Sequence, residues 1–318
     1  MPDLLSDVLS RLSIKGALYF RTAFTPPWGI EVPSFERVCR FHFVHRGECE
    51  IQVLASGERM KFHQGDLAIV PHGMSHVLSS VPADSVSVLP LEQFVEESGY
   101  SGRGVLVYEG DNREKSDHET QLICGHISFE TGAKHLILDR LPGLIRISNY
   151  GEAAGRWMDS TLRMIADETS GARIGGDLIA LKMSEVVFAQ AIRGFIEGEE
   201  GDQAGLSGFA DPKLARALDA FHNQPAESWT PENLAQVAGL SRTAFSQQFS
   251  AKIGVTPIQY LTTWRMQIAK QCLVHQNASV TDAAEIVGYA SESAFARVFK
   301  KEVGMTPAAY RADGQAKL

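Results

Sequence analysis

Residues 239–257, GLSRTAFSQQFSAKIGVTP, return about fifty residues later as residues 288–307, GYASESAFARVFKKEVGMTP. In both copies a glycine-led turn precedes two phenylalanines four residues apart, a β-branched residue, a glycine and a Thr-Pro pair. Seven positions match without a gap at a constant offset of 50: Phe245, Phe249, Ile253, Gly254, Thr256, Pro257 and Tyr260 against Phe295, Phe299, Val303, Gly304, Thr306, Pro307 and Tyr310. This internal repeat decides the fold of the C-terminal part.

Each copy predicts two helices joined by a tight turn. Thr230 and Pro231 mark the start of the first helix, because threonine accepts hydrogen bonds at an N-cap and proline fits the first helical position. Gly239 permits the turn, and Ser241 caps the second helix, whose phenylalanines share one stripe facing the first helix. The second copy repeats this plan over residues 280–303. This is the helix-turn-helix pattern, in which the second helix can enter the major groove of DNA.

The charge of the chain is unevenly distributed. Its formal net charge is −8, which disfavours nucleic-acid binding by the chain as a whole. Residues 1–210 carry a net charge of −10, whereas residues 211–318 carry +2. We therefore expect modest non-specific affinity for DNA that depends on where single basic residues lie, among them Arg242, Lys252, Arg265, Lys270, Arg297, Lys300 and Lys301.

Length and composition restrict the class of protein. At 318 residues the chain is expected to hold about two domains. It has no apolar run long enough to cross a membrane and no secretion signal, so we expect a cytoplasmic protein without a membrane partner. The four cysteines, Cys39, Cys49, Cys124 and Cys272, have no paired spacing, which argues against a disulfide framework.

The N-terminal part changes its periodicity along the chain. Residues 11–150 consist of short apolar runs broken by turn signals, the pattern of an all-β sandwich or barrel, and residues 90–118 predict a long polar loop. Residues 154–196 predict two helices with a glycine-rich break. The second helix has more apolar residues than one buried stripe can hold. Its second apolar face is therefore buried either against a partner chain or within the same chain. Residues 197–210, rich in glycine and acidic residues, predict an interdomain linker.

Two parts of the sequence resemble known families. Residues 211–311 are similar to the DNA-binding domain of the AraC/XylS family of transcription regulators, in which a linker helix joins two helix-turn-helix units. The likeness rests on LAQVAGLSRTAFSQQFSAKIGVTPIQYL, WRMQIAKQCL and TDAAEIVGYASESAFARVFKKEVGMTPAAYR. Residues 11–145 resemble the cupin-type sensor domain of many members through TPPWG (25–29), FHFVHRGECE (41–50), GDLAIVPHGMSH (65–76), ICGH (123–126) and LP (141–142).

The resemblance implies an α+β protein, with a cupin-like β-barrel and flanking helices followed by an all-α DNA-binding domain of two helix-turn-helix units joined by a linker helix. We divide the chain into a sensing and dimerisation domain (1–196), a linker (197–210) and a DNA-binding domain (211–318). The implied partners are double-stranded operator DNA, a small-molecule effector, RNA polymerase and a second copy of the chain. No catalytic activity is expected.

The helical wheel and the resemblance together predict which side chains face DNA. With the phenylalanines directed inward, Arg297 is the strongest candidate for a bidentate contact with guanine, and Gln247 for one with adenine. The predicted DNA-binding residues are Arg242, Thr243, Ser246, Gln247, Ser293, Ala296, Arg297, Lys300 and Lys301. Because the two helices expose different residues, one chain should read two different short sequences about one helical turn apart.

The resemblance to cupins also points to a candidate metal site. Residues 65–76 match the family's second motif and place His76 where its metal-binding histidine lies. The first motif departs from the family's His-x-His, because here His42 and His45 are three residues apart and point to opposite faces of a strand.

Cys124 and His126, in contrast, share a face of their strand. We hypothesise that four side chains line the barrel cavity and bind zinc or another divalent metal: His42, His76, Cys124 and His126. The alternative is that they are ordinary buried residues of a β core.

Two functional classes follow. In the first, the chain is a sequence-specific transcription regulator whose cupin-like domain senses a small molecule, a metal or a redox signal; a thiol sensor is one form of it, since a nearby arginine can lower the pKa of a cysteine. The relevant cysteines are Cys39, Cys49 and Cys124, and the arginines are Arg37, Arg40 and Arg46. In the second, the chain is a metal-dependent cupin enzyme fused to a DNA-binding module. The broken His-x-His motif argues against the enzyme.

Overall fold

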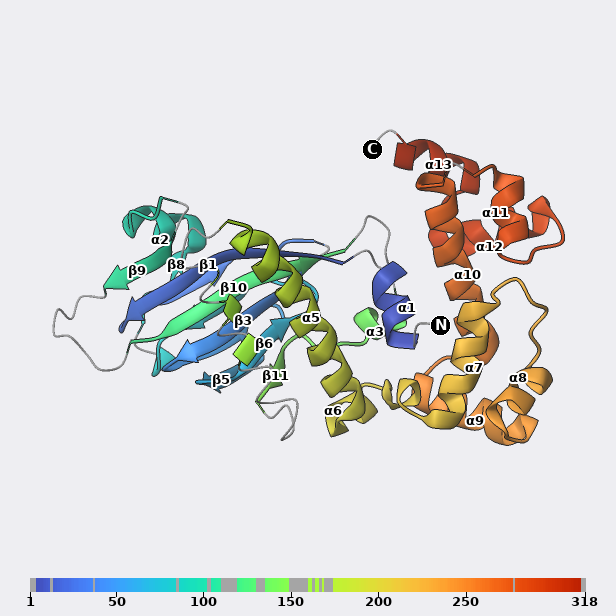
Figure 1. Ribbon diagram of the computed structural model, residues 1–318, viewed down its shortest axis with the longest axis horizontal. Helices are drawn as coiled ribbons and strands as arrows, with labels where there is room; N and C mark the ends of the chain where they lie inside the picture. Colours follow the sequence, from blue (N-terminus) through green and yellow to red (C-terminus); the bar gives the residue numbers. More distant parts are fainter. Residues whose placement is uncertain are drawn as a thin grey trace. The chain divides into compact units, whose positions relative to one another are not determined.

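The computed structural model describes residues 4–11, 14–36, 38–83, 86–101, 104–109, 119–129, 135–148, 174–276 and 278–315, together with 160–161, 164–165 and 168 (Figure 1). The chain forms two compact units. The helical unit consists of Met1–Leu12, Gly132–Arg140 and Ile196–Leu318, and the sheet unit of Ser13–Thr131 and Leu141–Phe195. Two short pieces of the N-terminal part, Met1–Leu12 and Gly132–Arg140, therefore belong with the C-terminal helices. The expected division at residues 196 and 210 assigns both pieces to the N-terminal domain.

The sheet unit is built from strands rich in β-branched and aromatic residues, which favour the extended backbone. The strands are β1 (Lys15–Thr25), β2 (Gly29–Val32), β3 (Val38–Arg46), β4 (Glu48–Val53), β5 (Arg59–His63), β6 (Leu67–Val70), β7 (His76–Ser79), β8 (Leu89–Pro90), β9 (Val105–Glu109), β10 (Gln121–Ser128) and β11 (Ile145–Ile147). They form one sheet of order β11-β6-β3-β10-β1-β9 and another of order β5-β4-β7-β2-β8.

The two sheets enclose one apolar core. It takes Phe24, Val44 and Cys124 from the first sheet and Ile51, Leu78 and others from the second. The chain changes sheet between β3 and β4 at Gly47, whose φ of 78° favours glycine. The cupin-like fold is confirmed, with one correction: in the described part of the chain the strands form two facing sheets instead of a closed barrel.

Residues 90–118, predicted as a long loop, contain regular structure on both sides of their undescribed part. Helix α2 (Leu91–Glu97) buries Phe94 against Phe24, with ring centroids 5.1 Å apart, and β9 contributes Tyr108, which stacks on Phe94 at 4.2 Å. The two elements were hidden by their polar neighbours, because each contributes only one or two core residues.

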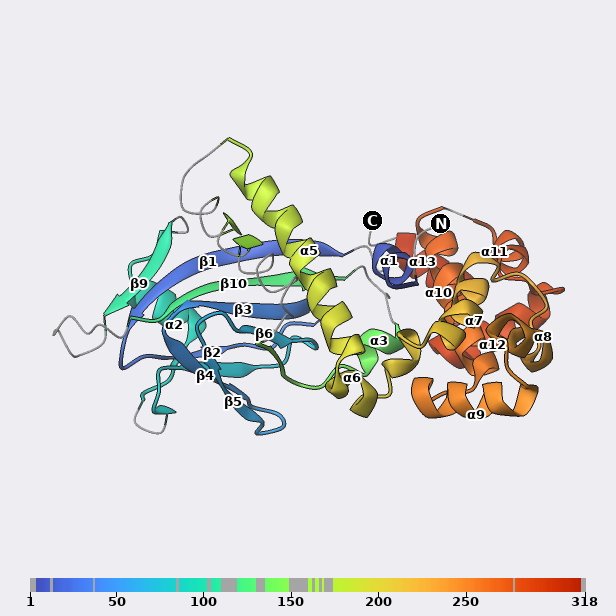
Figure 2. The ribbon, with the colours of Figure 1, turned by 60° about the horizontal axis from the view of Figure 1, so that its bottom comes forward.

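Helix α5 (Gly176–Glu197) is the second of the two helices predicted after the strands, and it lies across the six-stranded sheet (Figure 2). Phe188 approaches Phe129 at the end of β10, with ring centroids 6.1 Å apart, and the Gly16 N–H donates to Glu185 Oε1 at 3.3 Å. Most of the first predicted helix, from residue 154 to 170, lies outside the described residues.

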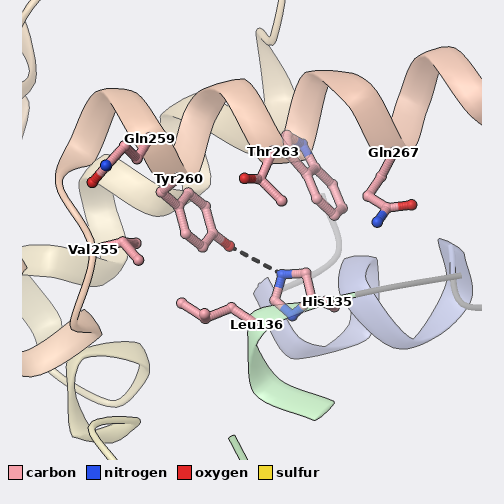
Figure 3. Close-up of a pocket in the computed structure, with 8 residues that line it drawn as sticks. His135, Leu136, Val255, Gln259, Tyr260, Thr263 and Gln267 are labelled. Carbon is pink, nitrogen blue, oxygen red and sulfur yellow. Dashed lines mark hydrogen bonds between the residues drawn. The ribbon is translucent and has the colours of Figure 1, made fainter. Parts of the chain in front are cut away.

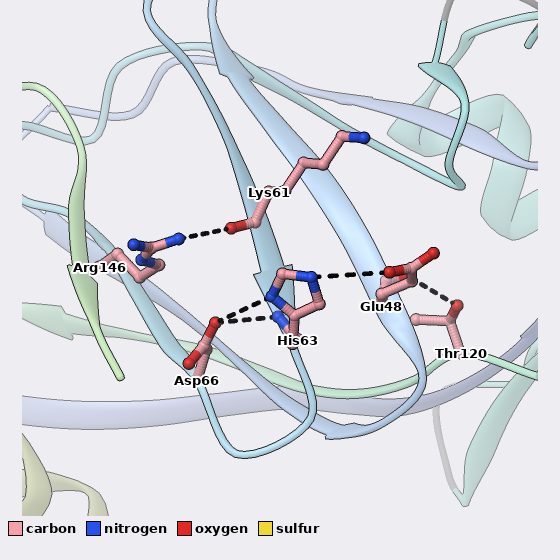
Figure 4. Close-up of polar contacts among 6 residues, drawn as sticks. All are labelled: Glu48, Lys61, His63, Asp66, Thr120 and Arg146. Atoms are coloured by element: carbon pink, nitrogen blue, oxygen red, sulfur yellow. Dashed lines mark hydrogen bonds and ion pairs between the residues drawn. The ribbon is translucent and has the colours of Figure 1, made fainter. Parts of the chain in front are cut away.

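A polar cluster ties the two sheets together at one edge (Figure 4). The His63 N–H donates to Asp66 Oδ2 at 2.9 Å and closes the turn between β5 and β6. Arg146 on β11 donates to the Lys61 carbonyl oxygen on β5 at 3.2 Å, and the Thr120 hydroxyl donates to the Glu48 carbonyl oxygen at 2.9 Å. Each contact satisfies a backbone group, at a strand end for His63 and Glu48 and on the edge strand β5 for Lys61, so the cluster has a structural role.

The helical unit consists of α1 (Leu4–Arg11), α3 (Leu136–Asp139), α6 (Glu199–Gln203), the 3-10 helix η2 (Ser207–Phe209), α7 (Pro212–Asn223), α8 (Pro231–Ala238), α9 (Arg242–Ile253), α10 (Pro257–Val274), α11 (Val280–Ile286), α12 (Glu292–Val303) and α13 (Pro307–Gln315). The two predicted helix-turn-helix units, α8–α9 and α11–α12, are confirmed, as is the linker helix α10.

Local capping signals explain where these helices begin. The side chains of Thr230, Ser241 and Ser291 each accept a hydrogen bond from a backbone N–H of the helix that follows. Thr256 forms a capping box with Gln259, which starts α10 at Pro257. The glycines that end α8, α9 and α12 adopt the left-handed conformation that glycine tolerates best.

Residues 197–210, predicted as a linker without periodicity, hold α6 and η2. Leu206 is fully buried and Phe209 nearly so, which anchors this stretch within the helical unit. Among the helices of the described residues, none combines the length and the hydropathy that a membrane crossing requires.

Candidate functional site

The first reading helix, α9, presents the side chains that the sequence predicts. Phe245 and Phe249 are completely buried, which fixes the rotation of the helix about its axis. Arg242, Thr243 and Gln247 are exposed on the opposite side, and Ser246 is partly buried between them.

The second reading helix, α12, repeats this arrangement with different chemistry. Its buried face consists of two phenylalanines, while Ser293 and Arg297 are exposed and Ala296 is partly buried. Lys300 and Lys301 are exposed in its last turn. The small residues Ser293 and Ala296 precede Arg297 on this helix, and the two lysines follow it.

The two helices differ in how their cations are engaged. Arg242 Nη1 lies 2.7 Å from Glu232 Oε1 of α8, with both side chains half exposed or more. Arg297, Lys300 and Lys301 have no ion-pair or hydrogen-bond partner within the described part of the chain. Within the described residues the cations of α12 are therefore outside any ion pair, whereas Arg242 is engaged by Glu232.

The other basic residues that the sequence brings forward have structural roles. Lys252 pairs with Asp211 at 2.6 Å. Arg265 donates to two backbone carbonyl oxygens at 2.7 Å, and Lys270 lies 5.9 Å from the centroid of the Tyr310 ring. These contacts stabilise the helical unit. Fewer basic side chains are therefore available to a ligand than the net charge of the domain suggests.

In the sheet unit, three of the four candidate metal ligands form a buried chain that joins the sheets. His42 on β3 lies opposite Cys124 on β10 in the register, and its Nδ1 is 3.1 Å from Cys124 Sγ. Its Nε2 is 2.9 Å from Nε2 of His76, which comes from the other sheet. His76 Nδ1 donates to the Met74 carbonyl oxygen at 2.8 Å.

These contacts determine where the protons lie. A carbonyl oxygen only accepts, so His76 carries its proton on Nδ1 and accepts at Nε2. His42 then donates from Nε2 and accepts the Cys124 S–H at Nδ1. Burial lowers the pKa of His76 to about 4 and, with the nearby His76 and Arg40, holds the pKa of His42 well below its usual range. The three side chains Cys124, His42 and His76 are therefore all uncharged, and each takes part in a hydrogen bond.

This arrangement does not fit a metal ion. Zinc requires its ligands to converge on one point at about 2.0–2.3 Å. Cys124 and His76 lie on opposite sides of the His42 ring, at Nδ1 and at Nε2, so the three cannot share one ion. No group of three potential ligands that could hold a metal ion occurs among the described residues.

His126 lies apart from the contacts that join the other three. It faces Arg40 in the register of β10 and β3, and burial followed by this arginine lowers its pKa. His45 contacts Phe43, with ring centroids 6.4 Å apart, on the side of β3 opposite to the core residue Val44. The prediction that His42 and His45 point to opposite faces is therefore confirmed.

Comparisons with known proteins identify the family. Residues 3–197 match a family model described as cupin, and residues 234–313 match one described as helix-turn-helix domain. A putative AraC-like transcription regulator of Streptomyces lividans is 32% identical over 317 residues, which cover 97% of this chain and 98% of that protein. The chain belongs to the AraC-like transcription regulators.

A further relative matches over a similar length, and a solved structure matches over about a third of the chain. The RCS-specific HTH-type transcriptional activator RclR of Escherichia coli K12 is 26% identical over 311 residues, 96% of this chain and 97% of that protein. The crystal structure of the DNA-binding domain of AdpA in complex with a target DNA is 33% identical, covers 34% of this chain and 96% of that chain, and has a TM-score of 0.32.

The cysteines of this AraC-like regulator are buried thiols. Burial raises the pKa of Cys124 to about 12 and raises those of Cys39 and Cys49 further. Arg40 acts on Cys124 in the opposite direction, but burial is the larger effect. Because the thiolate is the reactive form, these thiols lack the property that a thiol sensor needs.

The sequence did not reveal a second buried polar cluster, which belongs to the helical unit. The Tyr260 hydroxyl of α10 lies 2.8 Å from His222 Nε2 of α7 and 3.2 Å from His135 Nε2 at the start of α3. The repeat marks Tyr260 as a framework residue, but no local signal connects it with a histidine 125 residues earlier in the chain.

Proposed function

We propose that this AraC-type DNA-binding transcription regulator recognises its operator by sequence, through the exposed faces of α9 and α12. The observation that carries the proposal is Arg297, an exposed guanidinium of α12 without an ion-pair partner among the described residues, with the small residues Ser293 and Ala296 preceding it on the helix. A guanidinium in that position can make the bidentate contact with guanine that distinguishes this base from the others.

The test begins with a duplex selected from a random library by the full-length chain. Arg297→Ala should weaken binding to that duplex by about 1–3 kcal/mol and leave binding to random DNA nearly unchanged. Arg46→Ala, at an exposed arginine of β3, is the matched control and should alter neither. Equal losses on selected and random DNA would make Arg297 a phosphate contact instead.

We further propose that two chains pair through α5. One side of this helix is buried in the sheet unit, but Leu178, Ile179 and Val186 are 61%, 44% and 47% exposed. Leu178 and Val186 are two turns apart and so lie on the same side of the helix. Sedimentation of wild-type protein and Leu178→Glu checks the proposal, which requires a dimer that the substitution weakens; a wild-type monomer at micromolar concentration would contradict it.

The sheet unit is the proposed sensor. Support comes from its match to the cupin family model and from the hydrogen-bonded chain through His42, a polar feature in an apolar core. A small molecule that breaks or remakes these hydrogen bonds would change how the two sheets are held. A ligand of the folded chain has to raise its apparent stability, so screening by shifts in melting temperature can find it.

The remaining proposals follow from the regulator's role. Binding next to a promoter brings it to RNA polymerase, and the chain acts where the DNA is, in the cytoplasm. The competing proposal, a metal-dependent enzyme, is the weaker one, because His42 turns different nitrogens to Cys124 and His76. Metal analysis should accordingly find the same zinc content in the purified wild-type chain and in a Cys124→Ala and His76→Ala double variant. Stoichiometric zinc in the wild type that the double variant loses would contradict this.

A further inference from the structure

One short segment of the N-terminal part leaves the sheet unit. Residues His135–Arg140, called here the control segment, contain α3 and lie in sequence between β10 and β11, which belong to the same sheet. The control segment nevertheless belongs to the helical unit, while the chain from Leu141 onward returns to the sheet unit. The chain thus extends a piece of its sensor part into its DNA-binding part.

The control segment is held by a buried aromatic and polar cluster (Figure 3). His135 is 4% exposed, and its Nδ1 accepts the Ile137 N–H at 3.2 Å. Its Nε2–H must therefore donate to the Tyr260 hydroxyl, which in turn donates to His222 Nε2 at 2.8 Å. His222 stacks on Trp264 with ring centroids 3.8 Å apart.

The other end of the control segment reaches the joint between α9 and α10. Arg140 Nη1 donates to the Gly205 carbonyl oxygen at 3.4 Å, and its guanidinium lies against Gly254, the left-handed glycine that ends the first reading helix. A side chain at Gly254 would collide with this guanidinium. The control segment therefore touches both the end of α9 and the helix that follows it.

The second copy of the repeat lacks such a surface. Gly304, the counterpart of Gly254, has open space where Arg140 would lie, as far as the described residues show. Gly314 occupies the position that corresponds to Trp264, and Met305, the counterpart of the pocket residue Val255, is 39% exposed. The first unit alone is shaped to receive an additional element.

The control segment is joined to the sheet unit by the peptide bond between Arg140 and Leu141. Arg140 is followed directly by Leu141, whose side chain is 3% exposed and whose carbonyl oxygen accepts a hydrogen bond from His72 Nε2 at 2.8 Å. His72 precedes by two residues Met74, the carbonyl that holds His76 in the buried chain. The loop that carries His72 is thus linked to Arg140 by one hydrogen bond and one peptide bond.

We propose that the control segment is the coupling element of this regulator, which sets the position of the first reading helix according to the state of the sheet unit. The inference rests on the proposed function and specifies its regulation. A docked and a released control segment are the two states; a signal that alters the loop around His72 shifts their populations. The first reading helix responds, whereas the second, whose terminal Gly304 has open space in place of Arg140 among the described residues, stays bound to DNA.

The test combines one substitution on each side of the connection in the full-length chain. His72→Ala removes the donor to Leu141 at an exposed position, and Tyr260→Phe removes the hydroxyl shared by His135 and His222 while keeping the ring. Tyr310→Phe is the matched control, because Tyr310 is the counterpart of Tyr260 in the copy without a control segment. Hydrogen exchange of residues 135–141 and 250–262 and affinity for a duplex selected by the wild-type chain are the readouts.

Tyr260→Phe should speed exchange of the control segment by about fivefold, as expected for loss of one buried hydrogen bond, and Tyr310→Phe should leave it unchanged. His72→Ala should speed exchange of residues 250–262 and weaken DNA binding severalfold in the wild-type and Tyr310→Phe chains, but add little in the Tyr260→Phe chain.

The proposal is overturned if His72→Ala changes exchange and DNA affinity in the Tyr260→Phe chain as much as it does in the wild-type chain. It is also overturned if Tyr260→Phe leaves the exchange rate of the control segment unchanged. Failure of the wild-type chain to select any duplex would instead contradict sequence-specific binding, and the exchange measurements would still decide whether the coupling exists.

Discussion

Replacing His76 by glutamine should remove much of the acid sensitivity of the sheet unit. In the folded chain burial lowers the pKa of His76 to about 4, whereas in the unfolded chain it titrates near 6.5. Above pH 6.5 both states hold the neutral ring, so this group adds no pH dependence. Between pH 6.5 and 4 the unfolded state binds a proton that the folded state does not, and the free energy of unfolding therefore falls as the pH falls.

The magnitude follows from the difference between the two pKa values. Each pH unit within this window costs about 1.4 kcal/mol of stability, and the whole window costs about 3 kcal/mol. His42 contributes in the same direction, because its pKa is lowered too, and its share remains in the variant. The slope of stability against pH should thus be about 1.4 kcal/mol per pH unit smaller in His76→Gln than in wild type.

The two units require an assay that reports on the sheet unit alone. Samples equilibrated in urea at each pH receive a brief deuterium pulse at one fixed pH, and peptides from β3 and β10 give the unfolding midpoint. His275→Gln, at an exposed position in the helical unit, serves as the control. Equal slopes for wild type and His76→Gln between pH 6 and 4.5 would show that His76 is protonated in the folded state as readily as in the unfolded one.

Two further predictions concern the helical unit. Lys300→Gln and Lys301→Gln should each reduce the slope of log affinity against log salt concentration by up to about 0.9, measured by fluorescence anisotropy on random duplex; an unchanged slope would exclude phosphate contacts there. Gly254→Ala and Gly304→Ala should both lose about 1 kcal/mol because both glycines are left-handed caps, but Gly254→Ala should lose more, since its methyl group meets Arg140. Pulsed exchange of α9 and α12 measures both losses, and equal values would mean that Arg140 moves aside without cost.

The C-terminal helices could be predicted almost to the residue because their signals are local. Thr230, Ser241 and Ser291 cap helices within three residues of themselves, and Gly239 stops α8 where the sequence predicts. Such signals depend on hydrogen bonds within one turn and need no knowledge of the rest of the chain. The outward faces of α9 and α12 follow from the same periodicity.

The geometry of the sheet unit depended on long-range pairing. His42, His76 and Cys124 are buried together, but which nitrogen faces which partner depends on the register of β3 with β10 and on the facing sheet. Strand alternation gives the face of a residue and says nothing about its neighbour across the core. The metal hypothesis depends on these distances across the core, which the sequence does not provide.

The control segment was beyond sequence reasoning for a related reason. His135 and Tyr260 are 125 residues apart, and no periodic pattern marks a short helix whose partner lies in another part of the chain. A four-residue helix is also too short to leave a signal of its own. Residues 197–210 likewise predict a linker, because their glycines and acidic residues show no periodicity, and the few apolar residues that anchor them give no pattern.

The discontinuous helical unit has a consequence for synthesis on the ribosome. The control segment emerges 125 residues before Tyr260, and at about 5–20 residues per second this interval lasts on the order of 10 s. Throughout that time the nascent sheet unit carries Ile137, which is 1% exposed in the finished protein, without the helices that cover it. A newly made chain therefore acquires its control over DNA last, after both of the parts that the control segment connects have been translated.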